Sequence, residues 1–325
     1  MAVALPATPT LLARLRRYNY APLAAALALF VISALSSPYF LQPQNLLNIL
    51  RQVSYTGIIA LGMTFVIIGG GIDLSVGSMM AVVGALTITV LNRVGGDVGG
   101  GSGAIAVAAL ASIAFGGLLG LANGVTITKG KIAPFIVTLG TFAIFRSQAL
   151  YWGDAGEFRS TSAAFGEMGQ GTILGLPTPV WVWLLLAGGL NVLLNNTRYG
   201  RHVCAVGSNE RVAQYAAIGV DRIRMLTYVI VGGMVGVSAV LNTARLNSLS
   251  STNFGLNYEL DAIAAVIIGG TPMTGGRGSI WGTVVGAIIL GMISNWLNMV
   301  GISPYLQGTV KGLVIILAVF IQRIM

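Results

Sequence analysis

The sequence predicts an all-α fold: a polytopic bundle of about ten transmembrane helices with short broken helices and both termini in the cytoplasm. Only 8% of the 325 residues are charged and 55% are apolar, whereas soluble domains usually contain about 25% charged residues. Glycine, with 45 residues, is about twice as frequent as the usual ~7%. This composition excludes a soluble enzyme, a disordered tail and a disulfide scaffold.

The predicted spans follow from apolar segment length, because a helix needs about 20 apolar residues to cross ~30 Å of hydrocarbon. Ten segments approach this length: 21–36, 52–69, 75–91, 104–127, 134–152, 179–195, 225–246, 256–269, 280–300 and 305–322. They use most of the chain and leave no room for a soluble catalytic domain. We therefore expect one transmembrane domain over residues 1–325.

The basic residues support this topology. The chain has 18 Lys and Arg against 9 Asp and Glu, a net charge of +9. With ten crossings and both termini inside, twelve of the 18 basic residues face the cytoplasm, four face outside and two fall within spans. This bias is the one that the positive-inside rule expects. The basic excess thus indicates membrane topology, with the lipid bilayer and not nucleic acid as the partner.

Glycines within the spans predict close helix packing, since small residues let helix backbones approach. They recur at helical spacing in two segments: Gly116, Gly117, Gly120 and Gly124, and Gly282, Gly286 and Gly291.

Two segments also end alike, at Ile-Ile-Gly-Gly over 67–70 and 267–270, and each precedes a short polar stretch and another helix. This pattern fits either an internal repeat of about 200 residues or convergence in a glycine-rich chain.

The polar stretch 69–78 contains Asp73 and Ser75 directly before a predicted helix. Asp73 suits a helix cap that accepts hydrogen bonds from free N–H groups. It equally suits a broken-helix site beside a transport path, where exposed helix ends meet a polar substrate. The two interpretations are compatible.

A second acidic segment begins at Glu259 and Asp261, and it ends before Thr271. Acidic residues in a first turn complement the helix dipole, so a structural role competes with a substrate role. Two residues apart on a helix, the carboxylates lie about 200° apart and cannot both face one pore. From Glu259 to Gly270 the helix would be only ~18 Å long, which is too short for a span. Either residues from Asn253 onward join the helix, or it is a half-helix, which is a reasonable transport element.

The longest inner loop, 196–224, predicts a docking helix for a cytoplasmic partner. Asn209 suits the cap of a helix over 209–219, and Glu210 complements the positive helix end. The alternative is a solvated positive-inside loop, which would explain its arginines but not the Asn-Glu cap.

Several of these segments together resemble a known family. Gly-Gly-Ile-Asp-Leu-Ser-Val-Gly-Ser at 70–78, Gly-Ser-Asn-Glu at 207–210, Pro-Thr-Pro-Val-Trp at 177–181 and the segment 258–271, which begins Tyr-Glu-Leu-Asp, carry the likeness. They resemble the membrane subunits of bacterial ribose-type ATP-binding-cassette (ABC) sugar importers, from about residue 45 to the end.

The resemblance implies a multi-pass permease of the bacterial inner membrane. It would pair with a second permease subunit, as a homodimer or heterodimer, and bind ATP-binding-cassette subunits inside. A periplasmic sugar-binding protein would deliver a monosaccharide of the ribose, xylose, arabinose or galactose class. The chain itself would be no enzyme and bind no cofactor, because ATP and Mg would lie on the partner ATPase subunits.

In that family the inner loop carries a degenerate Glu-Ala-Ala motif. Glu210 matches, Arg211 and Val212 replace the alanines, and Ala217 stands where glycine is common, which bears on partner specificity. The ATPase-coupling candidates are Asn209, Glu210, Arg211, Ala213, Ala217 and Gly219.

Polar residues in spans and at helix breaks are the candidates for the translocation path, because intramembrane polar groups are functional candidates and Asn suits sugar hydroxyls. They are Asp73, Ser75, Glu259, Asp261, Thr271, Asn295 and Asn298. Gln148, Asn242, Arg146 and Lys311 also lie within spans, where Lys311 could snorkel and Arg146 could pair with an acidic group or a helix end.

On the outside, Arg51, Arg93, Arg159 and Arg245 could pair with acidic lobes of a binding protein, or be scattered solvated charges.

Motifs for other chemistries are absent. The nearest match to a phosphate loop, Gly130-Lys131-Ile132, lacks the leading glycine at Val125 and the hydroxyl residue. Protease and hydrolase motifs are missing, and no metal or catalytic site is expected from a single His202 and a single Cys204.

Two alternatives to the sugar importer remain. An ion-coupled secondary transporter would need buried carboxylates near the bilayer centre, whereas Asp73, Glu259 and Asp261 lie near predicted span ends. An ABC permease for a nucleoside, an amino acid or a signalling sugar would differ only in cargo.

Overall fold

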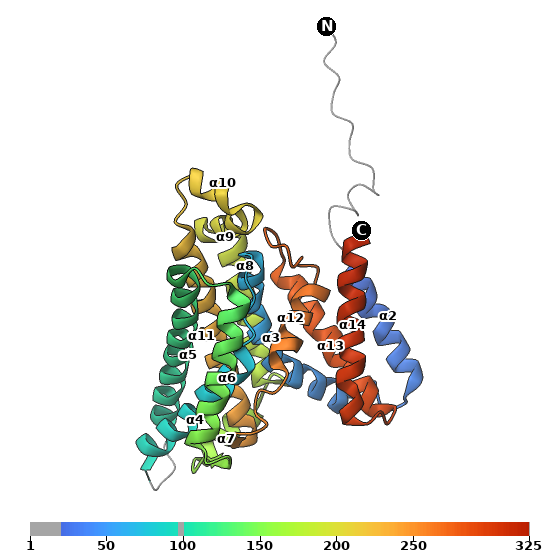
Figure 1. The fold of residues 1–325 in the computed structure, drawn as a ribbon. Helices are drawn as coiled ribbons and strands as arrows, with labels where there is room; N and C mark the ends of the chain where they lie inside the picture. Colours follow the sequence, from blue (N-terminus) through green and yellow to red (C-terminus); the bar gives the residue numbers. More distant parts are fainter. Residues whose placement is uncertain (1–20, 97–100, 325) are drawn as a thin grey trace.

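The computed structural model describes residues 21–96 and 101–324, and helices dominate this part of the chain (Figure 1). The helices are α2 (Ala21–Ser36), α3 (Pro43–Ile68), α4 (Val76–Gly95), α5 (Ser102–Gly130), α6 (Pro134–Trp152), α7 (Ala163–Gln170), α8 (Thr178–Asn196), α9 (Arg198–Ser208), α10 (Glu210–Tyr215), α11 (Val220–Leu246), α12 (Tyr258–Ile268), α13 (Ile280–Met299) and α14 (Pro304–Ile324). Short antiparallel strand pairs join β1 (Glu157–Arg159) to β4 (Ser248–Ser250) and β2 (Thr172–Ile173) to β3 (Leu176–Pro177).

Six of the described helices, α3, α4, α5, α8, α11 and α13, are long and apolar enough to cross a membrane. This set of helices is consistent with a polytopic helical membrane protein. The prediction of a cytoplasmic N-terminus falls on residues 1–20, which lie outside the described residues. The total of ten spans stays a prediction.

Most predicted spans match a helix, and α2 and α6 have the predicted bounds. The prediction was wrong at the start of α3, which begins at Pro43 and not at residue 52. Proline is well suited to the first turn of a helix. The polar residues that follow hid this turn from an apolar count, yet one of them is paired inside the protein: Asn45 donates to Asn295 on α13.

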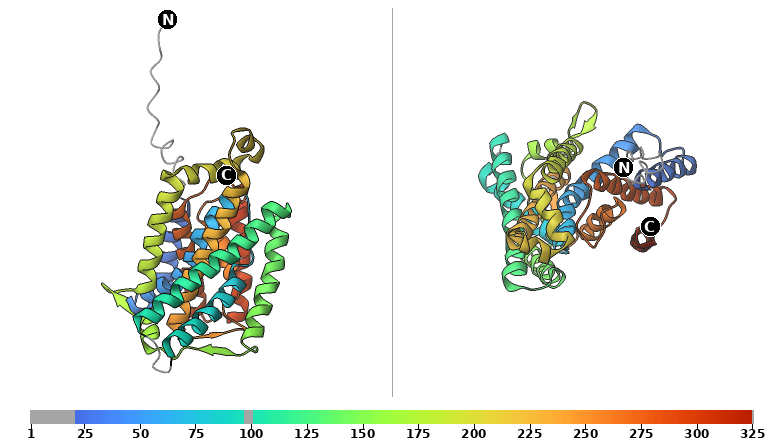
Figure 2. Two further views of the ribbon diagram at one scale, coloured as in Figure 1. Left: turned by 90° about the vertical axis from the view of Figure 1, so that its left-hand side faces the viewer. Right: turned by 90° about the horizontal axis from the view of Figure 1, so that it is seen from above.

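Helix α3 lies at the centre of the bundle and packs against α8, α11, α12 and α13. Seen from above in Figure 2, α5 and α6 lie at one side of the molecule, and α2 and α14 at the other. Helices α9 and α10 lie at one end of the bundle, where α14 also ends, and α7 lies at the opposite end (Figure 1).

The glycines of α5 pack against α11, as their spacing predicts. A Cβ at Gly116 would collide with the carbonyl oxygen of Gly232, and a Cβ at Gly120 with that of Tyr228. Gly117 is the exception, because a Cβ there would meet only the Val229 side chain at 3.9 Å. Backbone contact between the two helices thus requires glycine at particular positions and not at every one.

The repeated Ile-Ile-Gly-Gly pattern has a structural counterpart at the ends of α3 and α12. Gly71 N–H donates to Val66 O and Gly70 N–H to Ile67 O, at 2.9 and 3.0 Å. Thr271 and Gly270 repeat these bonds 200 residues later, to Val266 O and Ile267 O at 3.2 and 2.8 Å. Both Gly70 and Gly270 have positive φ, at 78° and 91°. This is the Schellman termination, formed twice from the same residue pattern.

The inner loop differs from its prediction. Residues 198–215 fold into two helices, α9 and α10, separated by Asn209, in place of one helix over 209–219. Helix α10 stops at Tyr215 after 6 residues, and Ala217 follows in the left-handed region with φ of 57°. Continuing α10 would require helical φ at Ala217, so the turn at this residue ends the helix.

Candidate translocation and coupling sites

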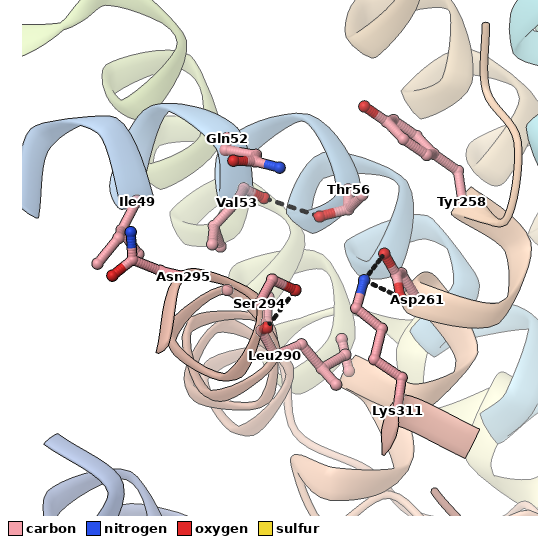
Figure 3. Close-up of a pocket in the computed structure, with 13 residues that line it drawn as sticks. Ile49, Gln52, Val53, Thr56, Tyr258, Asp261, Leu290, Ser294, Asn295 and Lys311 are labelled. Atoms are coloured by element: carbon pink, nitrogen blue, oxygen red, sulfur yellow. Dashed lines mark hydrogen bonds and ion pairs between the residues drawn. The ribbon is translucent and has the colours of Figure 1, made fainter. Parts of the chain in front are cut away.

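A polar pocket lies between α3, α12, α13 and α14 (Figure 3). Its volume is about 60 Å³, which has room for only a few water molecules. Four helices contribute the hydrogen-bonding side chains that line it, namely Gln52, Thr56, Tyr258, Asp261, Ser294, Asn295 and Lys311. Most of these groups are neutral donors or acceptors, which suits a solute that carries hydroxyl groups.

The two charged residues of the pocket form an ion pair. Lys311 Nζ donates to Asp261 Oδ1 and Oδ2 at 3.1 and 3.0 Å. Both side chains are largely buried, with 23% and 21% of their surface exposed. Because Lys311 comes from α14 and Asp261 from α12, the pair joins two helices across the pocket (Figure 3).

Two of the predicted path residues, Asp261 and Asn295, line this pocket. Asn295 and Asn45 exchange amide hydrogen bonds at 2.8 and 3.3 Å. Asn298 does not line the pocket, and it accepts a bond from Gln307 at 2.7 Å. Sequence reasoning missed Gln52 and Thr56, although their four-residue spacing on one helix face was a usable signal.

Glu259 lies on the other face of α12, as its spacing from Asp261 predicts. Its carboxylate packs over Gly77, and the residue is 8% exposed. Arg146 on α6 interacts electrostatically with it, while Arg146 Nη1 donates to the carbonyl oxygens of Ser251 and Phe254 at 3.2 and 3.0 Å. The two acidic residues of α12 therefore lie in different surroundings: Asp261 lines the pocket, and Glu259 lies outside it.

Asp73 and Ser75 form a third polar cluster, remote from the pocket lining. Asp73 Oδ1 accepts from the backbone N–H of Ser75 at 2.8 Å and from its hydroxyl at 2.6 Å. Asn123 of α5 donates to Ser75 Oγ at 2.9 Å. All three side chains are fully buried. The residue at the N-cap of α4 is Ser75, so Asp73 stabilises the chain before the helix and not its first turn.

Thr271 is buried in the loop between α12 and α13. Its hydroxyl oxygen accepts from the backbone N–H of Ser279 at 3.3 Å. Ser279 in turn caps α13 by accepting from Gly282 N–H at 3.1 Å. Thr271 thus closes the loop 271–279 onto itself.

The predicted coupling residues surround α10. Asn209 caps the helix by accepting from Val212 N–H at 3.1 Å, which confirms the predicted cap. Glu210 forms an ion pair with Arg224 of α11 at 2.8 Å, a partner that sequence reasoning missed. Ala213 is buried, Arg211 is exposed, and Gly219 precedes α11. Two exposed apolar side chains, Val212 and Tyr215, give α10 a surface suited to a protein partner.

The four outer arginines lie at or near the end of the bundle that holds α7 and divide into two pairs. Arg51 and Arg245 are partly buried: Arg51 donates to Gln170 O at 3.4 Å, and Arg245 stacks over the ring of Tyr55 at 5.7 Å. Arg93 and Arg159 are exposed. Hydrogen bonds from Ser248 and Arg159 lower the pKa of Glu157, so Arg159 already has an acidic partner.

The described residues contain no group of three or more His, Cys, Asp and Glu side chains that could hold a metal ion. The single cysteine, Cys204 on α9, is partly buried, and burial raises the pKa of its thiol.

Comparison with known proteins adds a family to this geometry. A family model described as "Branched-chain amino acid transport system / permease component" matches residues 45–319. The ribose import permease protein RbsC of Bacillus subtilis (strain 168) is 42% identical over 304 residues, which cover 93% of this chain and 92% of that protein. The D-allose permease protein AlsC of Escherichia coli (strain K12) is 36% identical over 92% of this chain and 89% of its own. The L-arabinose permease protein AraH of the same strain is 32% identical over 94% and 90%. No solved structure matches significantly.

Proposed function

The chain belongs to the family of transport-system permease components whose model matches residues 45–319, and from this premise we propose that it is the membrane-spanning permease subunit of an ABC importer for a monosaccharide. Relatives that cover more than nine-tenths of the chain are named as permeases for ribose and L-arabinose. The activity is therefore transport and not catalysis. The 42% identity to a ribose permease is the observation that carries the proposal, with a sugar of the ribose, xylose, arabinose or galactose class as cargo.

The pocket between α3, α12, α13 and α14 is the proposed contact point for this cargo. Gln52, Thr56, Ser294 and Asn295 supply neutral hydrogen-bonding groups, and such groups bind hydroxyls without requiring a charged solute. The pocket has room for only a few waters in this state. Passage of a sugar along this route consequently requires the helices around the pocket to move apart.

The partners follow from the two ends of the bundle. We assign α9, α10 and the end of α14 to the cytoplasm, in one transmembrane domain with ten spans in the bacterial inner membrane. Val212 and Tyr215 on α10 would contact an ATPase subunit, which holds ATP and Mg. At the outer end, the exposed Arg93 is the better candidate of the predicted arginines for a periplasmic binding protein, because Arg51 and Arg245 are partly buried within the protein. A second permease subunit, identical or different, would complete the pore.

An ion-coupled secondary transporter is the competing function, and one observation favours it. Asp73 and Glu259 are buried carboxylates, and buried carboxylates are typical of ion-coupled carriers. Both lie outside the polar pocket, however: Asp73 is hydrogen-bonded by Ser75, and Glu259 interacts electrostatically with Arg146, which supports structural roles for them.

Reconstitution separates the two functions. We would co-express the chain with an ATPase subunit and a sugar-binding protein from the same organism, place the purified complex in proteoliposomes, and measure uptake of radiolabelled ribose. The proposal expects uptake that requires internal ATP and the binding protein. Uptake by the chain alone, driven by a proton or sodium gradient, would refute it. Related pentoses and hexoses in the same assay would define the cargo.

A further inference from the structure

The backbone of the inner loop touches the backbone of the pocket helices at one place, which we call the glycine junction: Ile68, Gly207, Ser208 and Gly276. Gly276 N–H donates to Ile68 O at 2.8 Å, and the Ser208 hydroxyl donates to Gly276 O at 3.5 Å. A Cβ at Gly207 would collide with Ile68 O and lie 2.7 Å from Gly276 N. Only glycine at position 207 allows this approach.

The junction holds the end of α3 to the loop 271–279. Ile68 O is one of the last carbonyls of α3, which have no partner within the helix, and Gly276 supplies the missing donor. Gly276 has φ of 80°, a conformation that glycine adopts without the strain of other residues. A Cβ at Gly276 would also press on the backbone and hydroxyl of Ser208.

The junction is connected to α10 through a single residue. Ser208 is the last residue of α9, and Asn209, the next residue, caps α10. A displacement of α10 must therefore move Gly207 and Ser208. The ring of Tyr199 in α9 also stacks on Phe65 of α3 at 6.2 Å, so α9 and α3 contact one another over more than one turn.

The junction lies at the ends of three of the four helices that line the pocket, and the pocket itself lies further along these helices. Helix α3 ends at Ile68, α12 ends at Ile268, and α13 begins at Ile280 after the loop 271–279. The repeated Schellman terminations stop α3 and α12 before this loop. The fourth helix, α14, is joined to α12 through the Lys311–Asp261 ion pair.

The ion pair of α10 joins it to α11, a helix that does not line the pocket. Glu210 is joined to Arg224 of α11, and no residue of α11 lines the pocket. Helix α11 does pack along α3, but the glycine junction is where the inner loop itself meets the end of α3 and the loop 271–279, backbone to backbone.

We propose that the glycine junction passes ATP-driven displacement of α10 to α3, α12 and α13, so that Gly207 and Gly276 are positioning residues for transport. The inference rests on the proposed importer function. Interfaces of closely packed backbone transmit displacement because they have little freedom to deform. A side-chain contact such as the Tyr199–Phe65 stack can slide or change rotamer instead.

The test is Gly207→Ala in the full complex, with Gly188→Ala as the matched control, since a Cβ at Gly188 would meet nothing within 4 Å. We expect Gly207→Ala to keep the ATPase subunit bound and hydrolysing ATP, while sugar uptake per ATP falls about tenfold or more because the added methyl overpacks the junction. Gly188→Ala should retain its coupling. Normal coupling in Gly207→Ala would overturn the proposal, whereas failure of the unmodified complex to import sugar with ATP would refute the function itself.

A second measurement leaves the junction intact, in case Gly207→Ala fails to assemble. With Cys204 replaced by Ser, spin labels at Gln214 on α10 and Arg277 in the loop 271–279 report the distance across the junction; both residues are exposed. We expect this distance to stay constant between nucleotide-free and ATP-bound states, while the distance from Gln214 to a label on α5 changes. A Gln214–Arg277 distance that changes with nucleotide would overturn the proposal.

Discussion

Lys311 on α14 donates to both carboxylate oxygens of Asp261 on α12, at 3.0 and 3.1 Å, and so joins the two helices at the edge of the polar pocket. Helix α14 also presents large apolar side chains outward, among them Leu313, Ile316 and Leu317. The ion pair is thus a specific polar link between two of the four helices that line the pocket.

Breaking this pair is predicted to destabilise the protein. Lys311→Met or Asp261→Asn alone leaves one partly buried group without its partner. The expected cost lies between the ~1 kcal/mol of an exposed pair and the ~3 kcal/mol of a buried one. Thermal unfolding in detergent measures this. The double variant Lys311→Met with Asp261→Asn should recover most of the loss, and additive losses would contradict the pairing.

The amide pair between Asn295 and Asn45 is predicted to matter for transport. Asn295→Leu removes a hydrogen-bonding group from the pocket and leaves Asn45 without this partner, at a typical cost of about 1–3 kcal/mol. We expect lower sugar uptake with the ATPase still bound. Asn195→Leu, an exposed amide on α8 away from the pocket, is the control. Equal uptake by both variants would exclude Asn295 from the path.

Charge reversal at Glu210 should prevent ATPase docking. Glu210→Lys places two cations together, because Arg224 lies 2.8 Å from the Glu210 carboxylate, and it removes the acidic first-turn residue of α10. Co-purification of the ATPase subunit measures the effect. Glu167→Lys, an exposed acidic residue of α7 at the other end of the bundle, should leave docking unchanged. Adding Arg224→Glu to Glu210→Lys restores opposite charges and should recover part of the binding.

Ala217 is predicted to be a site where glycine stabilises the inner loop. Its φ of 57° places an L side chain in the left-handed region at a cost of about 1–2 kcal/mol. Ala217→Gly should slow hydrogen exchange over α10 and the turn after it. Ala216→Gly is the control, because Ala216 has φ of −81° and should lose stability on the same substitution. Faster exchange in Ala217→Gly would contradict the prediction.

Thiol chemistry at Cys204 should be slow at neutral pH. Burial raises the pKa of this thiol, so the reactive thiolate fraction is small at pH 7 and grows only as the pH rises above the ordinary value of about 8.5. Maleimide labelling across pH 7–10 measures this. Tyr215→Cys in a Cys204→Ser background places a thiol at a 90% exposed position and should label faster. Equal rates at pH 7 would contradict the effect of burial.

Local patterns in the sequence predicted much of the fold. Apolar runs gave the bounds of α2 and α6. Glycine spacing predicted that α5 packs closely against a neighbouring helix, and helical geometry placed Glu259 and Asp261 on different faces. The Asn209 cap was likewise predictable, because it depends on residues that are adjacent in the chain.

Long-range partners were not predictable from the sequence. Asn123 bonds to Ser75, Arg224 pairs with Glu210, and Gln52 shares a pocket with Tyr258 because of tertiary packing. The start of α3 was missed for the same reason, since Asn45 is polar and its partner Asn295 lies 250 residues away. An apolar count treats such a residue as the end of a span, although it belongs to a paired interior.

The Lys311–Asp261 pair also bears on how transport responds to membrane voltage. Moving a single charge across the whole membrane changes its electrostatic free energy by about 2.3 kcal/mol for every 100 mV of membrane potential. Because the two charges are opposite and held 3.0 Å apart, the ion pair itself moves no net charge when α12 and α14 shift together. Import of an uncharged sugar along this route would then proceed at the same rate in polarised and depolarised vesicles.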